Sequence, residues 1–185
     1  MKNLVFILSL IASIGFSQAS FAQIAMVANT ENAEIVENKT IVEVAIANKD
    51  FSTLVAALKA ADLVEALQGE GPFTVFAPSN DAFAKIDAET LSSLLEEKNK
   101  KALATILTYH VIPGKLVASD VAAALKEAKG TIELTTLNGQ LITIMTTNGK
   151  IWLKDQDNNY SKLIATDVMA SNGVIHVVNA VAMPN

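Results

Sequence analysis

Residues 74–83 read TVFAPSNDAF, a run that contains a strand, a corner and the start of a helix. The β-favouring side chains from 73 to 76 predict the strand. Pro78 ends it, because proline has no N–H to donate to a neighbouring strand. Ser79 and Asn80 carry short polar side chains of the kind that cap helices, and we expect Asn80 to cap a short helix here. The run therefore predicts a strand that turns directly into a helix.

A second informative run lies near the C-terminus, where residues 172–178 read NGVIHVV. Asn-Gly favours a type I′ turn, because both residues accept positive φ. The residues that follow are apolar on both faces of an extended chain, which predicts a central strand. A third run, YHVIPG at 109–114, reads as an extended segment that Pro113 and Gly114 bring to an end.

The order of hydrophobic periodicities along the chain predicts the fold class. Apart from the strand at 73–76, apolar residues recur at helical spacing between 41 and 107, and Ser119 is expected to cap a further Ala-rich helix. From residue 132 onward the apolar residues alternate with a period of two. Asn-Gly dipeptides at 138–139, 148–149 and 172–173 separate these runs and signal hairpins. Helices first and antiparallel hairpins second indicate an α+β fold.

The composition excludes several classes of protein. Hydrophobic residues make up 51% of the 185 residues and charged residues 18%, which excludes an intrinsically disordered chain. The formal net charge is −5 and every basic residue other than histidine is a lysine, so we expect no nucleic-acid partner. Cysteine is absent, which rules out disulfides and thiolate chemistry.

The N-terminus has the layout of a secretory signal peptide. Lys2 precedes an apolar run from 4 to 16, and Ser20 and Ala22 place small side chains at the −3 and −1 positions of a cleavage site. The run is short for a bilayer span of ~20 residues. We therefore expect cleavage before Gln23, a soluble secreted or periplasmic protein, and no membrane insertion after signal removal. The predicted organisation is a signal peptide at 1–22, a mobile lead at 23–39 and one domain at 40–185.

A search for catalytic or metal-binding residues yields no constellation. Without cysteine, His110 and His176 supply at most half of a zinc site, and both lie in apolar runs. We interpret them as buried side chains that are hydrogen-bonded to the backbone. Asp155 and Asp157 lie in a polar loop that lacks the glycine and distal glutamate of an EF-hand, which disfavours calcium. We predict no enzyme activity, no cofactor and no metal.

These runs resemble the motifs of the fasciclin family in their order and separation. Residues 74–83 are similar to the family's first motif, residues 172–178 to its second, and Tyr109-His110 to a dipeptide that lies between them. The resemblance covers residues 40–183 and is to a secreted single-domain fasciclin protein of bacterial type. It implies an α+β fold in which several helices pack against a wedge-shaped arrangement of antiparallel strands.

The resemblance also implies a function. Family members are mostly secreted or surface-attached adhesion and matrix proteins. It therefore implies a non-enzymatic, monomeric adhesion module whose partner is a cell-surface or matrix protein or a polysaccharide. The alternative is a carrier that holds a small apolar ligand, a pigment or a lipid, between its helices and its sheet. The high aliphatic content permits this alternative and equally fits an ordinary core.

Two candidate partner-binding pairs follow from the resemblance. One is Tyr109-His110. The other is Asp167-Val168, which matches an Asp-Ile pair proposed for integrin recognition in animal members, with valine in place of isoleucine. Each pair also has a structural interpretation, in which Tyr109 and His110 satisfy backbone groups and Asp167 caps a turn. Strand alternation sends Asp167 and Val168 to opposite faces unless the strand bulges between them.

Overall fold

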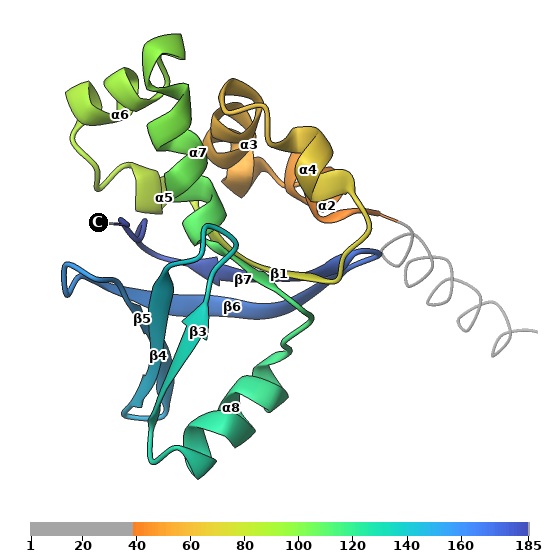
Figure 1. Cartoon of the computed structure of the whole chain (residues 1–185), viewed down its shortest axis with the longest axis vertical. Helices are drawn as coiled ribbons and strands as arrows, with labels where there is room; N and C mark the ends of the chain where they lie inside the picture. Colours follow the sequence, from red (N-terminus) through yellow and green to blue (C-terminus); the bar gives the residue numbers. More distant parts are fainter. Residues whose placement is uncertain (1–38, 185) are drawn as a thin grey trace, which may run out of the picture. The chain divides into compact units, whose positions relative to one another are not determined.

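The computed structural model describes residues 39–184, and the predicted signal peptide with nearly all of the predicted lead lies outside them. Helical elements dominate the first part (Figure 1). They are α2 (Ile41–Ala47), the 3-10 turn η1 (Lys49–Phe51), α3 (Ser52–Ala60), α4 (Val64–Gln68), α5 (Asn80–Phe83), α6 (Ala88–Leu94), the 3-10 turn η2 (Glu97–Asn99) and α7 (Lys100–Tyr109). Strand β1 (Phe73–Pro78) lies among them. The later elements are β2 (Val111–Pro113), α8 (Ala118–Glu127), β3 (Thr131–Thr135), β4 (Leu141–Thr147), β5 (Lys150–Lys154), β6 (Tyr160–Ala170) and β7 (Gly173–Val178).

The described strands form one seven-stranded sheet in the order β2-β1-β7-β6-β5-β4-β3. The α+β prediction is confirmed by the order of elements. The central place predicted for residues 174–178 is confirmed too, because β7 lies between β1 and β6 and is buried along its length. Neighbouring strands are antiparallel except β1 and β7, which run parallel with Phe73 opposite Gly173. One pair thus departs from a purely antiparallel sheet.

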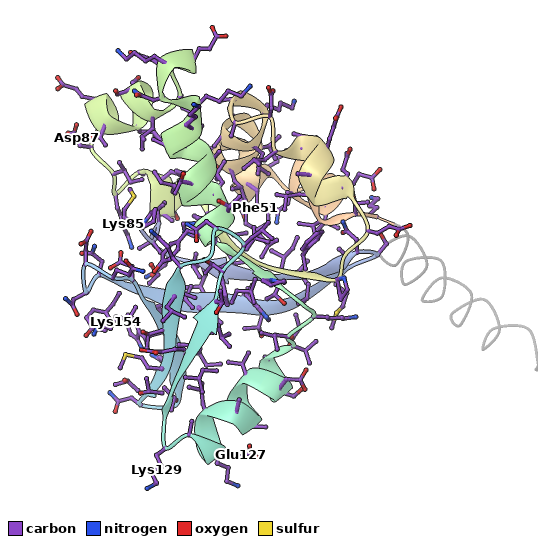
Figure 2. The ribbon with its side chains drawn as sticks, viewed as in Figure 1. Phe51, Lys85, Asp87, Glu127, Lys129 and Lys154 are labelled. Carbon is purple, nitrogen blue, oxygen red and sulfur yellow. The ribbon has the colours of Figure 1, made fainter. Side chains whose placement is uncertain are left out.

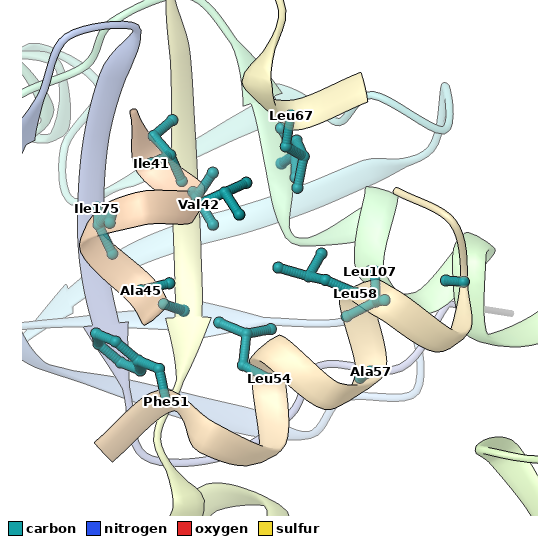
Figure 3. Close-up of a cluster of buried hydrophobic side chains, with 14 of the residues drawn as sticks. Ile41, Val42, Ala45, Phe51, Leu54, Ala57, Leu58, Leu67, Leu107 and Ile175 are labelled. Atoms are coloured by element: carbon teal, nitrogen blue, oxygen red, sulfur yellow. The ribbon is translucent and has the colours of Figure 1, made fainter. Parts of the chain in front are cut away.

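A first hydrophobic core lies between the helices and the two central strands. Figure 3 shows side chains of α2 and α3 gathered beside β1 and β7, with Val42 and Leu54 among them. Val75 and Ala77 of β1 face this core, as do alternate residues of β7. Full burial of one valine, leucine or isoleucine side chain contributes roughly 1.5–3 kcal/mol to stability, so this cluster fixes the helices onto the sheet.

A second core lies on the opposite face of the same strands. Phe76 and Val178, which alternate with the first-core residues, pack here against Ile144 and Leu153 of the hairpins and Leu125 of α8. Because β1 and β7 bury both faces, each contributes to both cores with a period of two. The sheet curls around this second core, since the loop after β3 donates a hydrogen bond from Leu137 N to Val111 O of β2 at 2.7 Å.

The corner after β1 is formed by two polar side chains with different roles. Ser79 is the N-cap of α5, and its hydroxyl accepts a hydrogen bond from Ala82 N at 3.3 Å. The expectation that Asn80 caps this helix is therefore wrong. The Asn80 side chain instead reaches across to the segment around η1, where it accepts from Thr53 N at 3.0 Å and donates to Lys49 O at 2.9 Å. The corner thus binds the start of α3 to the end of β1.

The three Asn-Gly dipeptides do not form the same turn: Asn138 and Asn172 lack positive φ, so the type I′ turn expected at residues 172–173 is not formed. Asn148 and Gly149 both have positive φ, 53° and 70°, as a type I′ turn between β4 and β5 requires. Lys129 and Gly130 also have positive φ where α8 gives way to β3. Figure 2 shows Lys129 projecting away from the ribbon at this end of the molecule.

Candidate functional site

Asp167 lies at an irregularity of β6 and caps a helix from a distance. The pairing of β6 with β7 shifts register between Ala165 and Val168, and Asp167 there has a φ of 60°. Its Oδ1 accepts a hydrogen bond from Ala118 N, the first residue of α8, at 2.7 Å. A carboxylate at this position satisfies an orphan N–H and opposes the positive end of the helix dipole. The helix therefore has its cap from β6, and Ser119, expected to cap it, lies within it.

His176 connects the Asp167 backbone to the segment that leads into α8. Its Nδ1 accepts from Asp167 N at 3.3 Å, and its Nε2 lies 2.8 Å from Leu116 O. Since a carbonyl only accepts, Nε2 carries the proton and the ring is the neutral Nε2–H tautomer. Both ring nitrogens of this fully buried residue are therefore used by backbone groups, in agreement with the structural interpretation.

Val168 directs its side chain toward the first core. It is half-buried, pairs with Ile175 of β7 and packs against the first-core cluster. The register shift that could turn Asp167 and Val168 to the same face is present in β6. Asp167 is nevertheless bound to α8, while Val168 packs against the first core. The pair therefore does not present a single mixed surface.

Tyr109 is the last residue of α7 and points into the second core. It is fully buried, and its hydroxyl donates to Leu141 O at 2.9 Å. Burial, together with the negative charge of Asp155, raises the pKa of the Tyr109 phenol to about 12. The phenol is therefore a neutral hydrogen-bond donor that holds α7 against the start of β4.

His110 follows directly and is held by the backbone from both sides. Its Nδ1 lies 2.8 Å from Ile106 O, and its Nε2 accepts from Ala182 N at 3.0 Å. This is the neutral Nδ1–H tautomer. Burial lowers the pKa of the His110 imidazole below its ordinary value, because the charged form would lose its hydration. Among the described residues, no hydrogen bond joins Tyr109-His110 to Asp167-Val168.

Asp155 uses its carboxylate to organise the polar loop and the chain end. It is buried, and it accepts from Asn159 N at 2.8 Å, Asn159 Nδ2 at 3.0 Å and Met183 N at 3.1 Å. Between residues 39 and 184, no three His, Asp or Glu side chains gather where they could hold a metal ion. The Asp155 carboxylate is thus hydrogen-bonded to backbone and side-chain amide donors of its own chain.

Asn172 is a structural residue whose role went beyond the turn expected from its sequence. Its Oδ1 accepts from Ile41 N at 2.9 Å, and its Nδ2 donates to Leu67 O at 2.8 Å and Gly69 O at 3.1 Å. One amide therefore ties the β6–β7 turn to the start of α2 and the end of α4. Its place beside glycine in the second motif was the available signal, but that signal indicates a turn and not a long-range clamp.

Comparison with known proteins identifies the family to which this architecture belongs. The family model of the fasciclin domain matches residues 49–184. The chain belongs to the fasciclin family. Protein sll1483 of Synechocystis sp. is 52% identical over 145 residues, which cover 78% of this chain and 73% of that protein. Human periostin is 35% identical over 142 residues, which cover 74% of this chain and 15% of periostin.

A solved structure shows that the fold is that of the family. The FAS1 domain pair from the insect cell adhesion molecule fasciclin I matches with a TM-score of 0.68 and 18% identity. The match covers 77% of this chain and 50% of that chain. The fasciclin domain of residues 49–184 therefore corresponds to part of these longer relatives. Within residues 39–184, no helix has the length and apolar composition needed to cross a bilayer.

Proposed function

We propose that this fasciclin protein is an exported, non-enzymatic adhesion module. The observation that carries the proposal is its family membership, together with the fold it shares with an insect cell adhesion molecule. The polar residues of the motifs support it indirectly. Asn80, Asn172 and both histidines are engaged by the backbone of their own chain, so they act as determinants of the fold.

In this proposal Tyr109, His110 and Asp167 serve adhesion by holding the domain together. The Tyr109 hydroxyl, both ring nitrogens of His110 and Oδ1 of Asp167 already have partners, and the two aromatic side chains are buried. Direct contact of either candidate pair with a partner stays a prediction from the sequence. Partner contacts are proposed instead on exposed surface that the fold leaves unused, with the protein acting as a soluble monomer after cleavage before Gln23.

The carrier alternative has less support from the packing. The cavity lined by Ile41, Leu54, Val75 and Ile175 of the first core measures about 20 Å³. A pocket for a drug-sized ligand measures about 300–1,000 Å³. A pigment or lipid between helices and sheet would therefore have to displace side chains that are already packed. Solvent extraction of the purified protein followed by mass spectrometry tests this alternative, and a stoichiometric apolar compound would favour it.

A bead-retention assay tests the adhesion function. The full chain is expressed in a bacterial host, recovered after export, and its N-terminus is established by intact mass. Beads coated with the protein are expected to be retained on the host's extracellular matrix, whereas beads coated with heat-unfolded protein are not. Equal retention of both preparations would contradict the proposal, and an intact Met1 in the membrane fraction would contradict export.

A further inference from the structure

The surface of interest is the outer face of the hairpin sheet, defined here as the face of β4, β5 and β6 opposite the second core. On β5, Ile151 and Leu153 pack toward that core. The alternation of a strand therefore directs Lys150, Trp152 and Lys154 to the outer face. Lys150 is exposed, and Trp152 and Lys154 are half-buried, so this face is open to solvent in the described part of the chain. Figure 2 shows Lys154 projecting away from the ribbon.

Strand register places three lysines around one indole. Lys150 and Lys154 lie two residues before and after Trp152 on β5, and Lys162 lies directly opposite it on β6. Residues two apart on a strand are roughly 6.5–7 Å apart, and directly opposite residues have Cβ atoms about 4.5–5.5 Å apart. Met145 of β4 is the opposite neighbour on the other side. The neighbouring positions around Trp152 on this face are thus lysine on three sides and methionine on the fourth.

The charge of this cluster is opposite to that of the protein. The chain carries a formal net charge of −5, yet none of these three lysines forms an ion pair. Glu133 of β3 lies on the same face but two strands away from Lys154, with Thr143 between them. Within residues 39–184, the ion pairs formed by lysine involve Lys98 and Lys100, which lie in the helical half. A local positive field on an acidic protein attracts an anionic partner to one place and orients it there.

The indole itself has an unsatisfied donor. Of the side-chain nitrogen and oxygen atoms described by the structure, Trp152 Nε1 is the one that is buried without a hydrogen-bond partner. Buried polar atoms in folded proteins nearly always have a partner, so this N–H calls for an explanation. Its neighbours Met145 and Lys162 have flexible side chains, and their movement would open the N–H to an oxygen atom of a ligand.

We propose that this face binds an anionic polysaccharide, with a sugar ring against Trp152 and its carboxylate or sulfate groups on Lys150, Lys154 and Lys162. Thr143 and Thr147 lie on the same face of β4, opposite Lys154 and Lys150, and supply hydroxyls for the sugar hydroxyls. Protein interfaces are depleted of lysine, whereas this surface has three lysines around its single indole. The inference rests on the proposed adhesion function and names a partner class for it.

Fluorescence offers a direct test, because Trp152 is the single tryptophan of the chain. The full exported protein is titrated with polygalacturonate, dextran sulfate and neutral dextran at low ionic strength. The expected result is a saturable change in Trp152 emission with one or both anionic polymers and none with neutral dextran. The two anionic polymers distinguish carboxylated from sulfated ligands. The response should weaken as salt rises, because exposed charges are screened over about 10 Å at 0.1 M.

A matched pair of triple variants assigns the effect to this face. Replacing Lys150, Lys154 and Lys162 by glutamine is expected to weaken polysaccharide binding by about tenfold or more. The control replaces three exposed lysines elsewhere, Lys59, Lys101 and Lys126, by glutamine, which changes the net charge equally. Affinity of the control, measured by calorimetry, should stay within about twofold of the parent. Trp152→Phe removes the N–H and should weaken binding in calorimetry while the protein stays folded.

Several outcomes would overturn the inference. These are no emission change with either anionic polymer, equal losses in the two triple variants, or tighter binding of polyglutamate than of both polysaccharides. The last outcome would indicate an acidic protein as the partner. If beads still adhere to matrix while polysaccharide binding is absent, the adhesion function stands and this surface is not its site. If adhesion is absent while polysaccharide binding is present, the polysaccharide site stands and the proposed adhesion function is wrong.

Discussion

The central strands β1 and β7 and the hairpin strands β4 and β5 are similarly apolar, yet they are built for different surroundings. Each central strand is buried on both faces and contributes to two cores. Each hairpin strand buries one face against the second core and leaves the other to solvent. The family motifs fall on and beside the central strands, and the lysine cluster falls on the hairpins. Substitutions at the centre should therefore unfold the domain, whereas substitutions on the outer face should change only what it binds.

The largest effect is expected from Gly173→Ala at the start of β7. A Cβ atom there would lie 2.0 Å from Phe73 O on the parallel neighbour β1, and a backbone carbonyl cannot move aside. The variant should lose more than about 4 kcal/mol or fail to fold. Gly149→Ala is the control, because nothing lies within 4 Å of its Cβ position and only the positive φ opposes the change. Its cost should be about 1 kcal/mol, and chemical denaturation measures both.

A neighbouring pair on β4 compares the two faces of one strand. Ile144 is fully buried in the second core, and Met145 is half-buried on the outer face. Ile144→Ala should cost about 2–5 kcal/mol because it leaves a cavity. Met145→Ala should cost about 1 kcal/mol or less, since its surroundings are partly solvent. Equal losses in denaturation would show that the outer face is packed as a core and would contradict the comparison.

Asp167 tests the link between the sheet and α8. Asp167→Ala removes the acceptor for Ala118 N and should cost about 1–2 kcal/mol. Asp167→Asn keeps an oxygen at this position and tolerates positive φ, so it should recover most of that loss. Adhesion per folded molecule should be unchanged in both variants. If adhesion falls in Asp167→Ala at temperatures where it remains folded, Asp167 contacts the partner as the family resemblance suggested.

The smallest expected effect is a pH dependence from His110. Its folded-state pKa is lowered, so above the ordinary value near 6.5 both states are neutral and its stabilising contribution is complete. As the pH falls below about 6.5, the unfolded chain takes up the proton first and the free energy of unfolding decreases. Urea denaturation between pH 7.5 and the acid limit measures the slope. His110→Asn should have a shallower slope, and an unchanged slope would exclude this histidine as the cause.

Local chemistry made much of this fold predictable. Alternation identified the hairpins, Asn148-Gly149 identified a type I′ turn, and residues that are apolar on both faces identified β7 as central. What could not be predicted depends on contacts between distant segments. The cap of α8 comes from a residue 49 positions away, and Asn172 binds Ile41 across 131 positions. No local pattern encodes such partners, because propensities act within a few residues.

In the candidate site too, features set by the local sequence were predictable and contacts between distant segments were not. Burial of His110 and His176 against backbone groups was predicted from their apolar surroundings, and the hydrogen bonds of both rings agree with it. Asp167 and Val168 are neighbours in the sequence, but their side chains lie in different surroundings, because the pairing of β6 with β7 shifts register between Ala165 and Val168. The lysines around Trp152 were not recognised, since they come from two strands and meet only through register.

The position of β7 determines the order in which the domain can fold. Phe73 and Gly173 pair across about a hundred residues of chain, and closing such a long loop is entropically costly and slow. Helices such as α7 can form within microseconds, but they have no finished sheet to pack on until the last strand arrives. During synthesis the earlier segments therefore emerge well before their organising strand. A chain that stops before residue 173 would retain its helix-forming sequences and lack the strand around which both cores close.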